Sequence, residues 1–150
     1  MTGDSDLPLL AMTKDFPEIG VVVKDLAVAE SFYAGTLGLP MVREVEISGP
    51  TASKAGCSSV PFRFKAFQVG DAQIKIVEVD GSPPTGTGKI DDATGVRYVT
   101  FSVESIDDAH RALLAAGVHM AGEVVEAVPG KFMFFFTDPD GNLLECIGPR

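Results

Sequence analysis

Apolar and polar positions alternate along this chain in short runs, and the order of the runs repeats. In the first half, apolar residues spaced as on one helix face occupy residues 26–35, with Asp25 placed as an N-cap. The strands around this helix are expected where β-branched and alternating residues gather, at 18–23, 41–47, 62–69 and 72–79. The first half therefore predicts a βαβββ unit.

The second half repeats this order with different residues. A helix is expected from the cap Ser105 to residue 116, where Gly117 ends it. Strands are expected at 96–103, 118–128, 131–137 and 142–147, with a turn at 138–141 before the last one. Both halves thus read β-α-β-β-β, which predicts an α+β fold with an internal structural duplication.

Segments poor in apolar residues mark the boundaries between these units. We expect a flexible leader at 1–15, a first module at 16–80, a linker at 81–94 and a second module at 95–150. Residues 48–61 are small, polar and rich in Gly and Ser, so they predict a flexible loop that could also serve as a lid.

Composition and charge narrow the range of partners. The chain is 45% hydrophobic with ten Phe, and its formal charge of −9 repels the phosphate backbone of nucleic acids. The first residues carry acids where a signal peptide carries bases, and no apolar run reaches membrane-spanning length. We therefore expect a cytoplasmic protein that binds neither nucleic acid nor membrane.

Three stretches resemble the glyoxalase/bleomycin-resistance/dioxygenase superfamily, also called the vicinal oxygen chelate superfamily. They are residues 19–39, residues 99–118 and residues 136–145, the last of which contains Asp-Pro-Asp-Gly-Asn, then two further residues and a Glu. The resemblance implies two modules whose sheets form an open, barrel-like curved mixed sheet around a central cleft. It also implies a homodimer and a small-molecule ligand.

The resemblance also implies which positions face the cleft. Relatives that bind a metal use four strand positions, usually occupied by His, Glu or Gln, His and Glu. In this sequence these positions fall on Glu18, Lys75, Tyr98 and Glu145. Only Glu145 matches the usual ligand set.

Strand alternation places further residues on the same face. In the strand at 96–103, Tyr98 alternates with the apolar positions, as do Thr100 and Ser102, and in the strand at 131–137 Met133 and Phe135 alternate with three phenylalanines. We take these four further residues as candidate substrate-binding positions: Thr100, Ser102, Met133 and Phe135. Arg97 should point away from Tyr98 or lie at the sheet edge, and in either place it is expected to be solvated.

The residues at positions 75 and 98 disfavour a bound metal ion. The ammonium group of Lys75 repels a cation, and Tyr98 would have to lose a proton with an unperturbed pKa of ~10. No cofactor is therefore expected, with a divalent metal as the alternative. Lys75 is expected to take the electrostatic place of the metal and to bridge Glu18 and Glu145.

This reasoning favours a metal-independent isomerase, epimerase or lyase that acts beside the carbonyl of a small molecule. Glu18 or Glu145 is the base, while Lys75 and the Tyr98 hydroxyl donate to the developing oxyanion. The first alternative is a binding protein that sequesters an antibiotic or another aromatic ligand. The second is a metal-dependent enzyme. Ring cleavage is disfavoured, because it needs two histidines and a carboxylate on iron.

Overall fold

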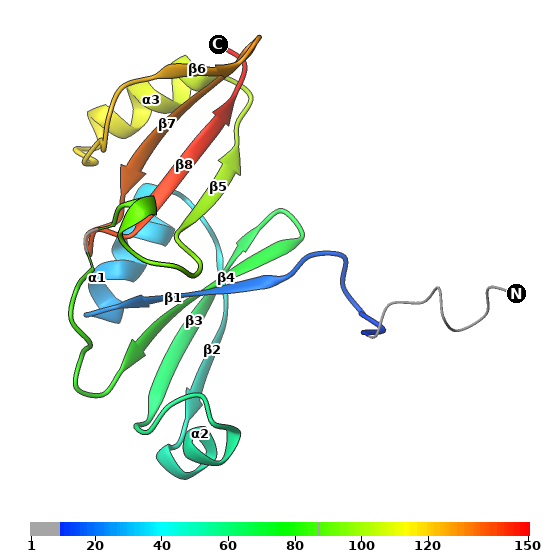
Figure 1. Cartoon of the computed structure of the whole chain (residues 1–150), viewed down its shortest axis with the longest axis vertical. Helices are drawn as coiled ribbons and strands as arrows, with labels where there is room; N and C mark the ends of the chain where they lie inside the picture. Colours follow the sequence, from blue (N-terminus) through cyan, green and yellow to red (C-terminus); the bar gives the residue numbers. More distant parts are fainter. Residues whose placement is uncertain (1–9, 87) are drawn as a thin grey trace, which may run out of the picture.

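The computed structural model describes residues 10–86 and 88–150, which form two four-stranded mixed sheets (Figure 1). Sheet A has the order β1-β4-β3-β2 and consists of β1 (Glu18–Val23), β4 (Ala72–Val79), β3 (Phe62–Val69) and β2 (Met41–Ile47). Sheet B has the order β5-β8-β7-β6 and consists of β5 (Tyr98–Ser102), β8 (Leu143–Gly148), β7 (Lys131–Thr137) and β6 (Val125–Val128). The predicted α+β fold of two βαβββ units is confirmed, and the sheets do not close into a barrel.

The helix of the first module begins where the sequence predicts. The Asp25 carboxylate accepts hydrogen bonds from the amides of Ala27 and Val28 at 2.9 and 3.1 Å, and α1 spans Leu26–Glu30. The chain then widens into a π-helical turn, η2 (Ser31–Thr36). Within this turn two successive aromatic residues, Phe32 and Tyr33, are both buried.

The helix of the second module, α3 (Ile106–Ala115), also follows its sequence signals. The Ser105 hydroxyl accepts a hydrogen bond from the amide of Asp108, and Gly117 adopts a φ of +77° just after the helix. Its buried residues Ile106 and Leu113 face sheet B. Local capping and apolar spacing thus account for both long helical segments.

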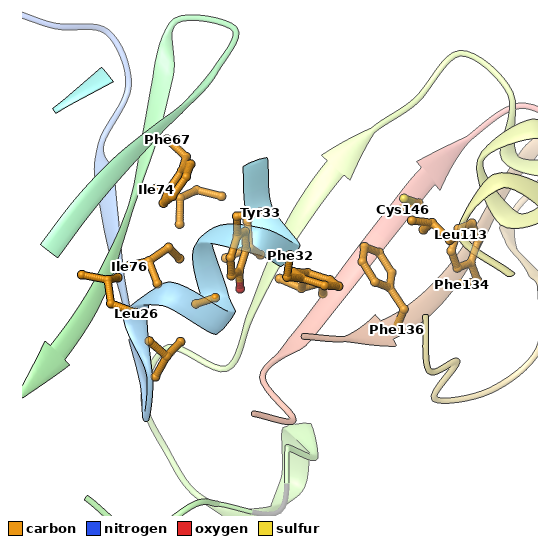
Figure 2. Close-up of a cluster of buried hydrophobic side chains, with 14 of the residues drawn as sticks. Leu26, Phe32, Tyr33, Phe67, Ile74, Ile76, Leu113, Phe134, Phe136 and Cys146 are labelled. Carbon is orange, nitrogen blue, oxygen red and sulfur yellow. The ribbon is translucent and has the colours of Figure 1, made fainter. Parts of the chain in front are cut away.

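The two modules share one hydrophobic core (Figure 2). In Figure 2, η2 places Phe32 and Tyr33 between residues of sheet A, such as Ile76, and the phenylalanines Phe134 and Phe136 of sheet B. One face of each sheet therefore points toward this core. We call the opposite face of each sheet its open face.

A buried hydrogen bond links the modules beside this core. The hydroxyl of Tyr33, which has no exposed surface, donates to Asp138 Oδ2 at 2.8 Å. Asp138 is 3% exposed and also accepts from the amides of Asp140 and Asn142 and from the Asn142 side chain. The turn predicted at 138–141 is therefore present, and its first residue anchors the first module to the second.

Two sequence predictions about local structure are wrong. The segment 48–61 is not all loop, because α2 (Gly49–Ala55) forms there, with its N-terminus capped by the Ser48 hydroxyl and with Ala52 fully buried. The strand expected at 118–128 is shorter. Only β6 pairs as a strand, whereas Met120 forms a single bridge to Phe136.

The segment between the modules packs closely against sheet B. It contains a short 3-10 turn, η3 (Ile90–Asp92), and a Cβ added at Gly88 would lie 2.4 Å from the carbonyl oxygen of Gly141. The guanidinium of Arg97 donates to the Lys89 carbonyl and pairs with Asp92. The expectation of a solvated Arg97 is therefore wrong, because this side chain holds the linker in place.

The described residues include no helix that is long and apolar enough to cross a membrane.

Candidate functional site

The open face of sheet B carries a row of three side chains at the same level. Strand pairing aligns Thr100 of β5 with Glu145 of β8, and Glu145 with Phe135 of β7. The Thr100 hydroxyl donates to Glu145 Oε1 at 2.7 Å. Glu145 is only 6% exposed, and no salt bridge joins it to a cation within residues 10–86 and 88–150. The structure thus holds a buried carboxylate with one hydroxyl donor.

The remaining candidates from sheet B surround this row. The ring of Tyr98 makes an edge-on contact with that of Phe135, with 5.5 Å between the ring centroids. Met133 and Ser102 both pair with Ile147, two residues beyond Glu145 on the same face. Tyr98 is 41% exposed, so part of this residue is accessible to a ligand.

A pocket of about 260 Å³ lies beside this row. Phe135 and Leu143 contribute from β7 and β8, and the linker contributes from the other side. Its full lining is Lys89, Ile90, Asp91, Ala121, Gly122, Glu123, Phe135 and Leu143. The lining combines apolar side chains with the charged residues Lys89, Asp91 and Glu123, a mixture found in sites for small organic molecules.

The open face of sheet A carries a second group of polar side chains. Glu18 forms ion pairs with Lys14 at 3.1 Å, with Arg43 at 2.9 Å and with Lys75 at 3.4 Å. The hydrogen bond from Lys14 lowers the pKa of the Glu18 carboxyl most. Burial acts in the opposite direction, Arg43 and Lys75 lower the pKa further, and the result is about 2. Glu18 is therefore a strongly stabilised carboxylate.

Two members of this group, Lys14 and Arg43, were not predicted from the sequence. Arg43 donates from Nη2 to both Glu18 and the Gln73 side-chain oxygen, and its guanidinium lies over the ring of Phe64. Alternation along the strand at 41–47 assigns Arg43 to one of two faces, but it does not reveal which side chains of other strands lie beside it. The strand order supplies that information.

The predicted bridge between the modules is absent. Lys75 pairs with Glu18, but no salt bridge or hydrogen bond joins it to Glu145 in the described part of the chain. Lys75 instead lies with its ammonium 5.2 Å from the centroid of the Phe64 ring. The four positions inferred from the resemblance thus form two separate groups, Glu18 with Lys75 on sheet A and Tyr98 with Glu145 on sheet B.

These side chains do not fit a divalent metal. No group of three His, Cys, Asp or Glu residues that could hold an ion occurs in residues 10–86 and 88–150. The carboxylate of Glu18 is engaged by three cations, one of which is the ammonium of Lys75 at a position where metal-binding relatives have a ligand. The positive charge of these groups repels a divalent metal ion.

Comparisons with known proteins found a family model that spans most of the chain and a relative of similar length. The sequence model of the Glyoxalase/Bleomycin resistance protein/Dioxygenase superfamily matches residues 15–146. The uncharacterized protein YaeR of Escherichia coli strain K12 is 28% identical over 136 residues, which cover 88% of this chain and 94% of that protein.

Solved structures show the same fold. A glyoxalase family protein from Bacillus cereus is similar with a TM-score of 0.76 and 20% identity, covering 95% of this chain and 98% of the other. The fosfomycin resistance protein FosX from Listeria monocytogenes is similar with a TM-score of 0.61 and 20% identity, over 93% and 96% of the two chains. At this identity the likeness concerns the fold alone.

Proposed function

Because the chain belongs to the Glyoxalase/Bleomycin resistance protein/Dioxygenase superfamily, we propose that it is a small-molecule enzyme using general acid–base chemistry beside a carbonyl. The reaction is an isomerisation, an epimerisation or a lyase step that begins with removal of the proton next to the carbonyl. The observation that carries this proposal is the buried carboxylate of Glu145 on the open face of sheet B.

Glu145 is the base in this proposal. Burying a carboxylate without a cationic partner costs stability, so such a group is more often kept for chemistry than for folding. The hydrogen bond from Thr100 orients the carboxylate on the open face. Glu18 is a poor base, because a carboxyl with a pKa of about 2 has little tendency to take a proton near neutral pH.

The surroundings of Glu145 support a small carbonyl compound as the substrate. The pocket beside Phe135 and Leu143 accommodates the apolar part of the molecule. The hydroxyl of Tyr98, a partly exposed residue on the same face, donates to the oxygen that gains negative charge when the proton leaves. No metal is part of the proposal, since the cations around Glu18 oppose one. A cytoplasmic homodimer remains our prediction.

Hydrogen exchange at the substrate carbon tests the proposal. The protein is dialysed against a chelator and incubated in D₂O with a panel of 2-oxo acids, α-hydroxy ketones and 2-substituted thioesters, and NMR follows loss of the α-proton signal. We expect exchange with at least one class. Glu145→Gln should slow it by about 100- to 10,000-fold, the usual contribution of a general base. Glu104→Gln, an exposed Glu outside both groups, is the matched control.

Three results would overturn this assignment. Exchange that needs an added divalent ion after dialysis indicates a metal-dependent enzyme. Ligand binding without any exchange indicates a binding protein. Equal loss of exchange in Glu104→Gln and Glu145→Gln removes Glu145 from the role of base.

A further inference from the structure

The open face of sheet A concentrates positive charge in an otherwise acidic protein. The chain carries a formal charge of −9, yet Lys14, Arg43 and Lys75 all approach the single carboxylate of Glu18. These four groups together carry a formal charge of +2. We call them the cationic cluster. One carboxylate does not neutralise three cations, so the cluster retains attraction for a further anion.

No other acid on this face competes for the charge. Strand pairing places Glu18, Arg43 and Lys75 on the open face, where they are the only ionisable strand residues of sheet A. Their neighbours on this face are mostly apolar: Val22, Val45, Phe62, Phe64 and Val77. An apolar surround strengthens the attraction between a cation and an incoming anion.

Phe64 holds two of the cationic groups close together. The guanidinium of Arg43 lies 5.6 Å and the ammonium of Lys75 lies 5.2 Å from the centroid of its ring. Lys75 stands between two residues with little or no side chain, because pairing places Gly20 on one side and Ala66 on the other. The two residues paired with Lys75 therefore have no side-chain group that could bond to its ammonium.

Both cations keep donors for a ligand. Arg43 uses Nη2 for its hydrogen bonds to Glu18 and Gln73, while its Nε and Nη1 make no hydrogen bond within the described residues. Lys75 has three protons and one ion pair, with Glu18. Their side chains are 42% and 35% exposed, so an anion can reach them from solvent.

We propose that Arg43 and Lys75 form a binding site for a small oxyanion, either a carboxylate or a phosphate or phosphonate group of a ligand. Glu18 already shows that the cluster accommodates carboxylate oxygens at 2.9–3.4 Å from both side chains. The planar guanidinium suits oxyanions with two adjacent oxygens. The site lies on sheet A and does not depend on the chemistry proposed for Glu145, so either proposal can fail alone.

Titration with inorganic phosphate and with acetate tests this site. The chemical shifts of backbone amides are followed at constant ionic strength, which removes general screening. We expect saturable shifts around Gly20, Ala66 and Gln73. Arg43→Gln and Lys75→Met should each weaken binding by about tenfold, the usual loss for one charge-assisted hydrogen bond. Tighter phosphate binding identifies a phosphoryl or phosphonate ligand, and tighter acetate binding identifies a carboxylate.

Two further variants make the test decisive. Arg63 projects from β3 toward the other face of the same sheet, where it pairs with Glu78, so Arg63→Gln lowers the net charge equally and should leave the affinity unchanged. Glu18→Gln removes the competing carboxylate and should tighten binding. Equal weakening in Arg63→Gln and Lys75→Met, or no saturable shift in wild-type protein, would overturn the proposal. Circular dichroism confirms that each variant is folded.

Discussion

Replacing Tyr33 with phenylalanine removes one oxygen atom from the contact between the two modules. In the wild-type protein that oxygen donates to Asp138 at 2.8 Å, and both residues are buried. The phenylalanine ring keeps the contacts of the tyrosine ring in the shared core, including the edge-on packing against Phe32. The substitution therefore isolates the hydrogen bond from the packing.

The magnitude follows from what remains at Asp138. A hydrogen bond to a charged group contributes about 1.5–3 kcal/mol. Asp138 keeps the amides of Asp140 and Asn142 and the Asn142 side chain as donors, so the carboxylate is not left unpaired. We expect the lower part of the range, about 1.5–2 kcal/mol, and a fall in Tm of about 3–8 °C for a chain of this size.

Urea denaturation followed by circular dichroism measures this loss. The midpoint should fall while the slope stays constant, because the surface exposed on unfolding is unchanged. The chain contains one other tyrosine, so Tyr98→Phe is a matched control. Tyr98 is 41% exposed and should change stability by less than about 0.5 kcal/mol.

Alkaline pH provides a second measurement of the same bond. Burial, and then the nearby Asp138, raises the pKa of Tyr33 far above its ordinary value of 10.0. The folded protein keeps this proton where the unfolded chain loses it, so the stabilisation is complete below pH 10 and declines above it. The difference between wild type and Tyr33→Phe should therefore shrink above pH 10. A difference under about 0.5 kcal/mol at pH 7, or one that is constant to pH 11, would refute this account.

Two further predictions concern the acidic group on sheet A and the linker. The pKa of Glu18 is lowered from 4.5 to about 2, so its stabilisation is present above pH 4.5 and is lost as the pH falls toward 2. An NMR titration of the Glu18 carboxyl group should give a midpoint at about pH 2, and Lys14→Met should raise this midpoint. Gly88→Ala should destabilise the protein by more than about 1 kcal/mol, because Gly88 has a φ of +76° and a Cβ would meet the Gly141 carbonyl oxygen. Gly86→Ala, with open space around it, should be neutral or slightly stabilising in the same denaturation assay. Equal effects of the two alanines would argue against the close approach at Gly141.

The elements that the sequence predicts well are those fixed by local signals. Asp25 and Ser105 cap their helices through side-chain oxygens, and these bonds involve residues two or three positions away. The short helix α2 lacks an apolar stripe. Its one fully buried residue is Ala52, so its small, polar sequence resembles that of a loop.

The candidate site could be predicted only as far as strand alternation reaches. Alternation places Thr100 and Phe135 on the same face as Glu145, and the structure brings these three residues together. It does not specify how far apart the two sheets lie, so the expected bridge from Lys75 to Glu145 was wrong. The partners of Glu18 depend on strand order, because Arg43 comes from the opposite edge strand of the sheet.

The helical segment that begins at Leu26 is part of the first repeat, but its buried side chains pack in a core shared with the second repeat. If the chain were cut within residues 81–86, the first fragment would present Phe32 and Tyr33 to water, and the second would present Phe134 and Phe136. The sequence repeat is therefore not a unit of independent folding. Cleaving this protein at its linker should yield two fragments that aggregate through exposed apolar surfaces, rather than two functional domains.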